Sequence, residues 1–208
     1  MDFLQTIKQK AKADKKTIVL PESQDLRVLK ATEKIIKEDL AKVILIGNEK
    51  EILEKAEGLN ISGAEIIDPG SYAQMNDFID ALVELRKNKG MTKEKATELL
   101  QDPLYFGVMM VKKGIAHGMV AGAVNSTADV LRPSLQILKT APNTKLVSSF
   151  FVMVVPDCEY GEKGVFIPIE LNDGVLQTVS QTYLNYKEID GGKRIFINEM
   201  QGVEVYKT

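Results

Sequence analysis

The stretch "TIVLPESQDLRVLKATEKIIKEDLAKVILIG", residues 17–47, decides the fold. Its apolar segments "TIVL" and "KVILIG" predict two buried strands, the first bounded by Pro21 and the second by Gly47. The segment between them predicts a helix, because its apolar residues recur at helical spacing: Leu26, Leu29, Ile35 and Ile36. A strand, a helix and a strand in this order predict a βαβ unit with parallel strands.

The same alternation continues along the chain. A helix is expected at 48–59, a short strand at 64–69, helices that end near Gly90 and Gly114, and a strand at 117–123. The predicted fold class is therefore α/β, with a mostly parallel sheet flanked by helices. We expect one α/β/α domain over residues 1–145 and a partial or replaced second domain over 146–208.

The last part of the chain has a different character. An apolar strand is expected at 145–155, shorter strands near 165–170 and 194–200, and a helix from about Gly174 to Tyr186. The two shorter strands are candidates to cover the apolar one. This tail contains no compact chemical motif.

Composition excludes several classes of function. A net charge of −2 gives no general electrostatic reason to bind nucleic acid or a membrane surface. The single cysteine, Cys158, excludes an intrachain disulfide framework and a cysteine-based zinc site, and the single histidine, His117, excludes a multi-histidine metal site. The first residues lack the apolar core of a signal peptide and no apolar run reaches membrane-spanning length, so a cytoplasmic protein is expected.

The segment "GAVNSTADVLRPSLQILKT", residues 122–140, is the candidate binding site. It follows a predicted parallel strand, and Ser126 and Asp129 have capping-box spacing at the start of a helix. Backbone N–H groups at a helix start attract anions, and the hydroxyls of Ser126 and Thr127 add donors. Arg132 supplies a planar guanidinium that matches phosphate oxygens, in a chain where only four of the 27 Lys and Arg residues are arginine. The pattern predicts a phosphate or acyl-phosphate site.

A plainer interpretation remains open for the same residues. Ser126 and Asp129 would then only cap the helix, and Arg132 would form a surface salt bridge. Arg86 has two interpretations as well, compensation of a helix dipole or a second phosphate contact. The sequence contains no GxGxxG, GxxxxGK[ST] or HExxH motif, so nicotinamide, ATP and metalloprotease functions lack their usual signals.

Four segments together resemble the phosphate acetyltransferase family: "IVLPES…LRVLKA", "ELRKNKG", "GAVNSTADVLRPSLQILKT" and "VMVVPDCEYGEKG". The resemblance covers residues 1 to about 166 in the family's order, and phosphate butyryltransferases are the relatives most easily confused with it. It implies two α/β/α domains resembling isocitrate dehydrogenase, a dimer or other homo-oligomer, and interconversion of acetyl-CoA plus phosphate with acetyl phosphate plus CoA. CoA is then a substrate, and no permanently bound cofactor or metal is implied.

The resemblance also implies roles for individual residues. Arg132 would hold the phosphate or acetyl-phosphate oxygens, and Arg86 would contact a phosphate of CoA. Ser126 and Thr127 would line the phosphate pocket, and Cys158 would lie near the active site without acting as the nucleophile. The implied mechanism is direct attack of the CoA thiolate on the acetyl carbonyl, with Arg132 stabilising the developing charge.

The tail departs from the family pattern. Family members carry a C-terminal serine–arginine pair and an aspartate, and no "LSRG"-like motif occurs in residues 167–208. The alternative to an acyltransferase is therefore a non-catalytic CoA- or phosphate-binding α/β domain, or a truncated remnant of the enzyme. A different reaction on a dehydrogenase-like fold is disfavoured, because the nucleotide-binding motifs are missing.

Overall fold

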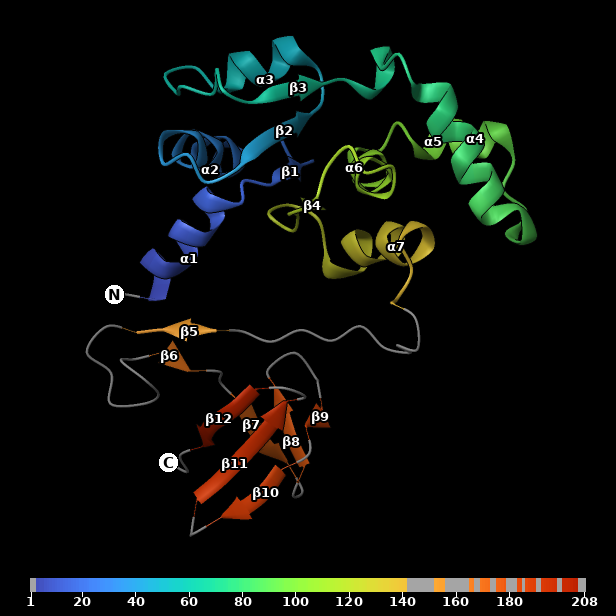
Figure 1. Ribbon diagram of the computed structural model, residues 1–208. Coiled ribbons are helices and arrows are strands. Elements are labelled where there is room, and N and C mark those ends of the chain that lie inside the picture. The colour runs from blue at the N-terminus through green and yellow to red at the C-terminus, as the bar shows by residue number, and fades with distance from the viewer. Residues whose placement is uncertain are drawn as a thin grey trace. The chain divides into compact units, whose positions relative to one another are not determined.

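Strand β1 (Thr17–Leu20) lies inside a four-stranded parallel sheet of order β3-β2-β1-β4 (Figure 1). The structure, a computed structural model, describes residues 3–141, 152–155 and the strands between 165 and 205. The neighbouring strands are β2 (Lys42–Ile46), β3 (Glu65–Ile67) and β4 (Gly118–Met119). Thr17 pairs with Lys42 and Ile18 with Gly118, so the carboxyl ends of β1, β2 and β4 lie at one edge. The predicted parallel α/β sheet is confirmed.

Helices cover both faces of this sheet. After β1 and β2 come α2 and α3, which lie on one face, while α6 covers the other together with the helices around it (Figure 1). The helix bounds are α1 (Phe3–Ala13), α2 (Leu26–Lys37), α3 (Glu49–Lys55), α4 (Met75–Arg86), α5 (Lys93–Leu99), α6 (Pro103–Lys112) and α7 (Thr127–Ile137). Short 3₁₀ helices occupy Pro69–Ser71 and Lys87–Lys89. None of the helices in this described part combines the length and apolar character needed to span a bilayer.

Alternate strand residues enter two separate cores, as the two-residue period of a strand requires. The core toward α4, α5, α6 and α7 receives Val19, Ile44 and Ile46. The core toward α2 and α3 receives Leu20, Val43 and Leu45. The continuous apolar composition of β1 and β2 is thus explained by burial on both faces.

Helix α6 lies unusually close to the sheet because it contains Gly107. A Cβ atom there would lie 2.9 Å from Sδ of Met119 and 3.1 Å from Cγ1 of Val19. The adjacent Phe106 is fully buried, with its ring centroid 5.1 Å from that of Tyr72 and 5.3 Å from that of Phe78. These rings join α6 to α4 and to the segment before α4, which fixes the two helices relative to each other.

The predicted helix ends are confirmed where the sequence contains capping residues. Asp102 caps α6 by accepting a hydrogen bond from the Leu104 N–H, with Pro103 as the first helical residue. After α4 the chain forms a turn of 3₁₀ helix, and this turn ends on Gly90. Gly90 has φ 73°, a left-handed conformation that glycine adopts at no steric cost.

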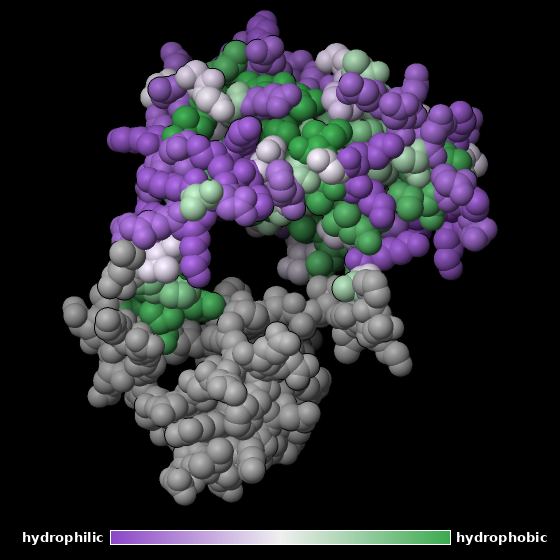
Figure 2. Space-filling view, in the orientation of Figure 1, coloured by the Kyte–Doolittle hydropathy of each residue, from purple (hydrophilic) through white to green (hydrophobic). Residues whose placement is uncertain are grey.

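Helix α7 is continuous through Pro133 and does not restart at this residue. Pro133 and Ile137 are buried, whereas Leu131, Leu135 and Leu138 are exposed. Figure 2 shows hydrophobic residues at the surface over α7, between the polar residues of the outer helices.

The tail forms antiparallel strands. They are β5 (Met153–Val154), β6 (Val165–Phe166), β7 (Ile169–Asn172), β8 (Val175–Thr178), β9 (Tyr183–Leu184), β10 (Tyr186–Ile189), β11 (Gly192–Ile197) and β12 (Met200–Val205). The pairing of β5 with β6 confirms that a strand near 165 covers the apolar strand at 153–154. The remainder of the strand expected at 145–155 lies mostly outside the described residues.

The helix expected at 174–186 is wrong, because β8 and β9 occupy this range. Asn172 pairs with Val175, which leaves two residues, Asp173 and Gly174, between β7 and β8. An Asp-Gly pair in the sequence favours a β-hairpin over a helix, which is the physical reason for the difference.

The chain divides into two units, residues 4–139 and residues 140–208 with 1–3. That residues 146–208 form a partial or replaced second domain stays a prediction. All residues considered below for the site, except Cys158, belong to the first unit.

Replacing Phe106 with alanine should lower the free energy of unfolding of the first unit by about 3–5 kcal/mol, since it leaves a cavity among buried rings. Urea unfolding followed by circular dichroism measures this change. Leu53→Ala on α3 is the control, because Leu53 is half exposed and should change stability by less than about 0.5 kcal/mol. Equal losses in the two variants would contradict this account of the core.

Candidate active site

The loop between β4 and α7, residues 120–126, follows the carboxyl end of a parallel strand, where open α/β sheets bind ligands. Its base is fixed by His117, whose backbone N–H donates to the Thr17 carbonyl over 2.9 Å while its Nδ1 accepts from the Thr17 N–H over 3.1 Å. Gly122 has φ 110°, which other residues rarely adopt. The loop can therefore turn sharply toward the end of β1.

The carboxylate of Glu22 organises this loop. Its Oε2 accepts hydrogen bonds from the backbone N–H groups of Gly122 and Ala123, over 2.8 and 2.7 Å. Its Oε1 accepts from the N–H groups of Val124 and Asn125 and from Nδ2 of Asn125, over 3.0, 2.8 and 2.8 Å. Glu22 is 8% exposed and comes two residues after β1. One carboxylate thus accepts from four consecutive backbone donors of the loop.

These contacts determine the charge state of Glu22. Burial by itself raises the pKa of the carboxyl group, but the hydrogen bonds from Asn125, Val124 and Ala123 outweigh it and lower the pKa from 4.5 to about 2. The side chain is therefore an anion at neutral pH.

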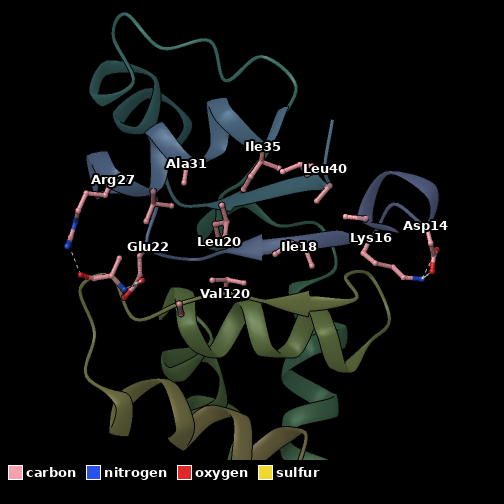
Figure 3. Close-up of a pocket in the computed structure, with 15 residues that line it drawn as sticks. Asp14, Lys16, Ile18, Leu20, Glu22, Arg27, Ala31, Ile35, Leu40 and Val120 are labelled. Atoms are coloured by element: carbon pink, nitrogen blue, oxygen red, sulfur yellow. Dashed lines mark hydrogen bonds and ion pairs between the residues drawn. The ribbon is translucent and has the colours of Figure 1, made fainter. Parts of the chain in front are cut away.

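Arg27 holds the same loop from its other side. Its guanidinium forms two hydrogen bonds with the Asp25 carboxylate, over 2.9 and 2.8 Å, and donates to the Ala123 carbonyl. Figure 3 shows Glu22 and Arg27 approaching the loop from the end of β1 and the start of α2. Both side chains also border a cavity of about 600 Å³ whose other lining residues are mostly apolar.

Ser126 is the N-cap of α7, as its spacing predicts. Its Oγ accepts from the Asp129 N–H over 3.3 Å, and its hydroxyl donates to Asp129 Oδ2 over 2.6 Å. The other oxygen of Asp129 lies 3.8 Å from a terminal nitrogen of Arg132. Ser126, Asp129 and Arg132 are therefore linked at the start of α7, and Thr127 is exposed beside them.

The surface ion pair of the plainer interpretation is thus present, but its geometry is weak. The side chains of Arg132 and Asp129 are 59% and 47% exposed, and exposed pairs at this distance contribute little to stability. Arg132 therefore keeps most of its donors directed to solvent, where they are free to meet a ligand.

Tyr105 is under the electrostatic influence of both candidate arginines. Burial raises the pKa of its hydroxyl, the positive charge of Arg132 lowers it, and that of Arg86 lowers it further. Its hydroxyl donates to Oε1 of Gln136 on α7 over 3.2 Å. This hydrogen bond ties the first turn of α6 to α7, the helix that carries Arg132.

Arg86 is half-buried, and its Nε is buried without a hydrogen-bond partner among the residues that the structure describes. A buried donor without a partner is unfavourable by about 1–3 kcal/mol, so native proteins rarely leave one unsatisfied. Within residues 3–141 and 152–155, Arg86 also forms no ion pair. Compensation of the α4 dipole alone does not explain why Nε is buried without a partner.

Cys158 lies outside the described residues. In the part of the chain that is described, no group of three or more His, Cys, Asp or Glu side chains could hold a metal ion. Sequence reasoning missed Glu22, although a Pro-Glu pair directly after a buried strand at the ligand-binding edge was an available signal.

The start of α7 and the loop before it lie at the carboxyl ends of parallel strands, and this arrangement defines an open α/β protein. The model of the phosphate acetyl/butaryl transferase family matches residues 2–168, and the chain belongs to this family. It is 63% identical over 167 residues to the phosphate acetyltransferase of Acetivibrio thermocellus, covering 80% of this chain and 50% of that protein. The corresponding enzyme of Thermoanaerobacterium thermosaccharolyticum is 54% identical, with 80% and 51% covered.

Solved structures agree with this assignment. A phosphotransacetylase from Streptococcus pyogenes superposes with a TM-score of 0.73 at 35% identity, covering 80% of this chain and 51% of that one. The EutD phosphotransacetylase from Staphylococcus aureus superposes at 0.70 and 37% identity, with 79% and 48% covered. The chain thus spans about half the length of the relatives it matches.

Glu22 should make the stability of the first unit depend on pH in the acid range. Its pKa is lowered on folding, so its contribution is complete above pH 4.5 and is lost as the pH falls toward 2. Glu22→Gln should lower the free energy of unfolding by up to about 3 kcal/mol at neutral pH. The variant should also lose less stability than the unmodified chain as the pH falls between these limits. Urea unfolding at several pH values measures this. Parallel curves for the variant and the unmodified chain would contradict the assigned role.

Proposed function

We propose that this chain forms part of a phosphate acetyltransferase, which transfers an acetyl group between CoA and inorganic phosphate. The observation that carries the proposal is the 63% identity over 167 residues with a phosphate acetyltransferase. The region matched by the family model, residues 2–168, contains all the proposed site residues: Arg86, Ser126, Thr127, Arg132 and Cys158.

Arg132 is proposed to bind the phosphate oxygens of acetyl phosphate. Its exposed guanidinium offers paired donors that match two phosphate oxygens, and its ion pair with Asp129 is long enough to be displaced. Ser126 and Thr127 line the same pocket at the positive end of α7. Because the Ser126 hydroxyl already donates to Asp129, Thr127 is the better candidate for a direct hydroxyl contact.

Arg86 is proposed to bind a phosphate group of CoA. Support comes from its buried Nε, which has no hydrogen-bond partner among the described residues. A phosphate oxygen would satisfy this donor in a site where burial strengthens the interaction. Arg86 and Arg132 would then face two different phosphates on either side of Tyr105.

The proposed chemistry is a single displacement at the acetyl carbonyl. The CoA thiolate attacks the carbonyl carbon, a C–S bond forms, and the C–O bond to phosphate breaks, so that phosphate leaves with the electron pair. Cationic donors such as Arg132 stabilise the charge that develops on oxygen. We assign no base among the described residues; the resemblance to the family attributes thiol activation to a C-terminal serine–arginine pair and aspartate.

Further parts of the proposal concern the whole protein. Cys158 lies near the site without forming an acyl-enzyme, the protein acts in the cytoplasm, and it assembles as a homodimer. Acetyl is preferred over butyryl as the transferred group, in line with the names of the curated relatives.

Arg132→Ala should reduce kcat/KM for acetyl-CoA formation from acetyl phosphate and CoA by about 10²–10³-fold, the usual effect of removing one donor to a developing oxyanion. Arg132→Lys should recover only part of the loss, because a single ammonium cannot bind two oxygens in parallel. The control is Lys50→Ala, an equally cationic and highly exposed position on α3. A full rate in Arg132→Ala would exclude the proposed role.

Arg86→Ala should weaken CoA binding about tenfold and leave phosphate binding unchanged, which titration calorimetry measures for each ligand separately. Dephospho-CoA lacks one phosphate group of CoA. If that phosphate is the partner of Arg86, the unmodified chain and Arg86→Ala should bind dephospho-CoA with equal affinity. Binding of both ligands without turnover in a folded sample would favour the non-catalytic binding domain. Equal losses for CoA and phosphate would argue against two separate sites.

A further inference from the structure

Glu22 occupies a position that an anionic ligand occupies in many phosphate-binding proteins. Consecutive backbone N–H groups that converge on one point form a nest, which binds anions such as phosphate. Here the N–H groups of residues 122–125 converge on one carboxylate, with five donors at 2.7–3.0 Å counting the Asn125 amide. Because these donors are already satisfied, the nest is closed to substrate.

We propose that Glu22 is a positioning residue, a built-in anion that fixes loop 122–125 so that Thr127 and Arg132 present their donors to phosphate. The inference rests on the proposed function of α7 as the phosphate side of the site. It separates two anion positions: the nest holds the protein's own carboxylate, and the start of α7 is left for the ligand.

The order of residues supports a direct mechanical link. Asn125, the last residue that donates to Glu22, immediately precedes the N-cap Ser126. Ser126 is linked through Asp129 to Arg132. A loop held at its N–H groups by Glu22 and at the Ala123 carbonyl by Arg27 leaves the start of α7 little freedom.

The chemistry of this position requires a carboxylate. Two carboxylate oxygens accept at about four lone-pair sites, whereas glutamine has one acceptor oxygen and a donor NH₂ group. Glu22→Gln therefore places a donor against two backbone N–H groups that lose their acceptor. The resulting loop would be looser, although the side chain keeps the same size.

The first measurement is amide hydrogen exchange of the full chain. In Glu22→Gln the amides of residues 122–125 should exchange at least about tenfold faster, since two of them lose their acceptor and the other two keep only an uncharged one. The amides of strand β2 should be unchanged. The matched control is Glu33→Gln, because Glu33 also accepts from a backbone N–H, that of Asn60, over 2.7 Å. That variant should affect Asn60 and leave the loop unchanged.

The second measurement separates positioning from a general structural role. Calorimetric titration of Glu22→Gln should show that phosphate affinity is weakened by about 10–100-fold, because a small misplacement of a binding group has a large effect. The affinity for CoA should be nearly unchanged. Glu22→Asp, which keeps the charge but reaches less far, should give intermediate values in both measurements. It provides the test if Glu22→Gln does not fold.

Unchanged exchange at residues 122–125 would overturn the proposal. Faster exchange with unchanged phosphate affinity, or with equal losses for phosphate and CoA, would overturn the positioning role. Failure of the unmodified chain to bind phosphate at all would instead refute the proposed function, and the positioning role with it.

Discussion

The segment that follows β1 holds the ligand-binding edge of the sheet together on both sides. Glu22 accepts from the loop after β4, and the next residue, the fully buried Ser23, accepts from the Ile46 N–H over 3.0 Å at the end of β2. Two adjacent polar side chains thus tie the central strand to both neighbours. Their hydrogen bonds are strong because they lie where water is largely excluded. The position of α7, and of every candidate residue on it, depends on these contacts.

The two cores explain why this edge is rigid enough to carry a site. Alternate residues of β1 and β2 enter opposite cores, so neither strand can shift by one residue without exposing apolar side chains on both faces. Gly107 allows α6 to lie directly on the sheet, and the buried ring of Phe106 joins it to α4. The helices that carry Arg86 and Tyr105 are thereby fixed to the same sheet as the loop.

The site residues differ in how far the sequence could predict them. The Ser126 cap and the helix that contains Arg132 follow from local spacing, and the structure confirms the cap. The electrostatic influence of Arg86 and Arg132 on Tyr105 links residues of three helices, and no local pattern contains it. In the tail, a helix was expected where β8 and β9 form, although the Asp-Gly pair at its start favours a hairpin.

The sequence by itself determined the parallel α/β class, the helix caps at Asp102 and Ser126, and membership of a family of acyl-phosphate enzymes. The fold class and the caps depend on short-range periodicity and on side chains that bond to their own backbone within a few residues, whereas the family membership depends on the matching segments of sequence. Only the tertiary structure decided the partner of Glu22, because its donors lie about a hundred residues further along the chain. It alone also decided that Arg86 keeps a buried donor with no partner in the described part of the chain, since burial depends on how α4 packs against the other helices.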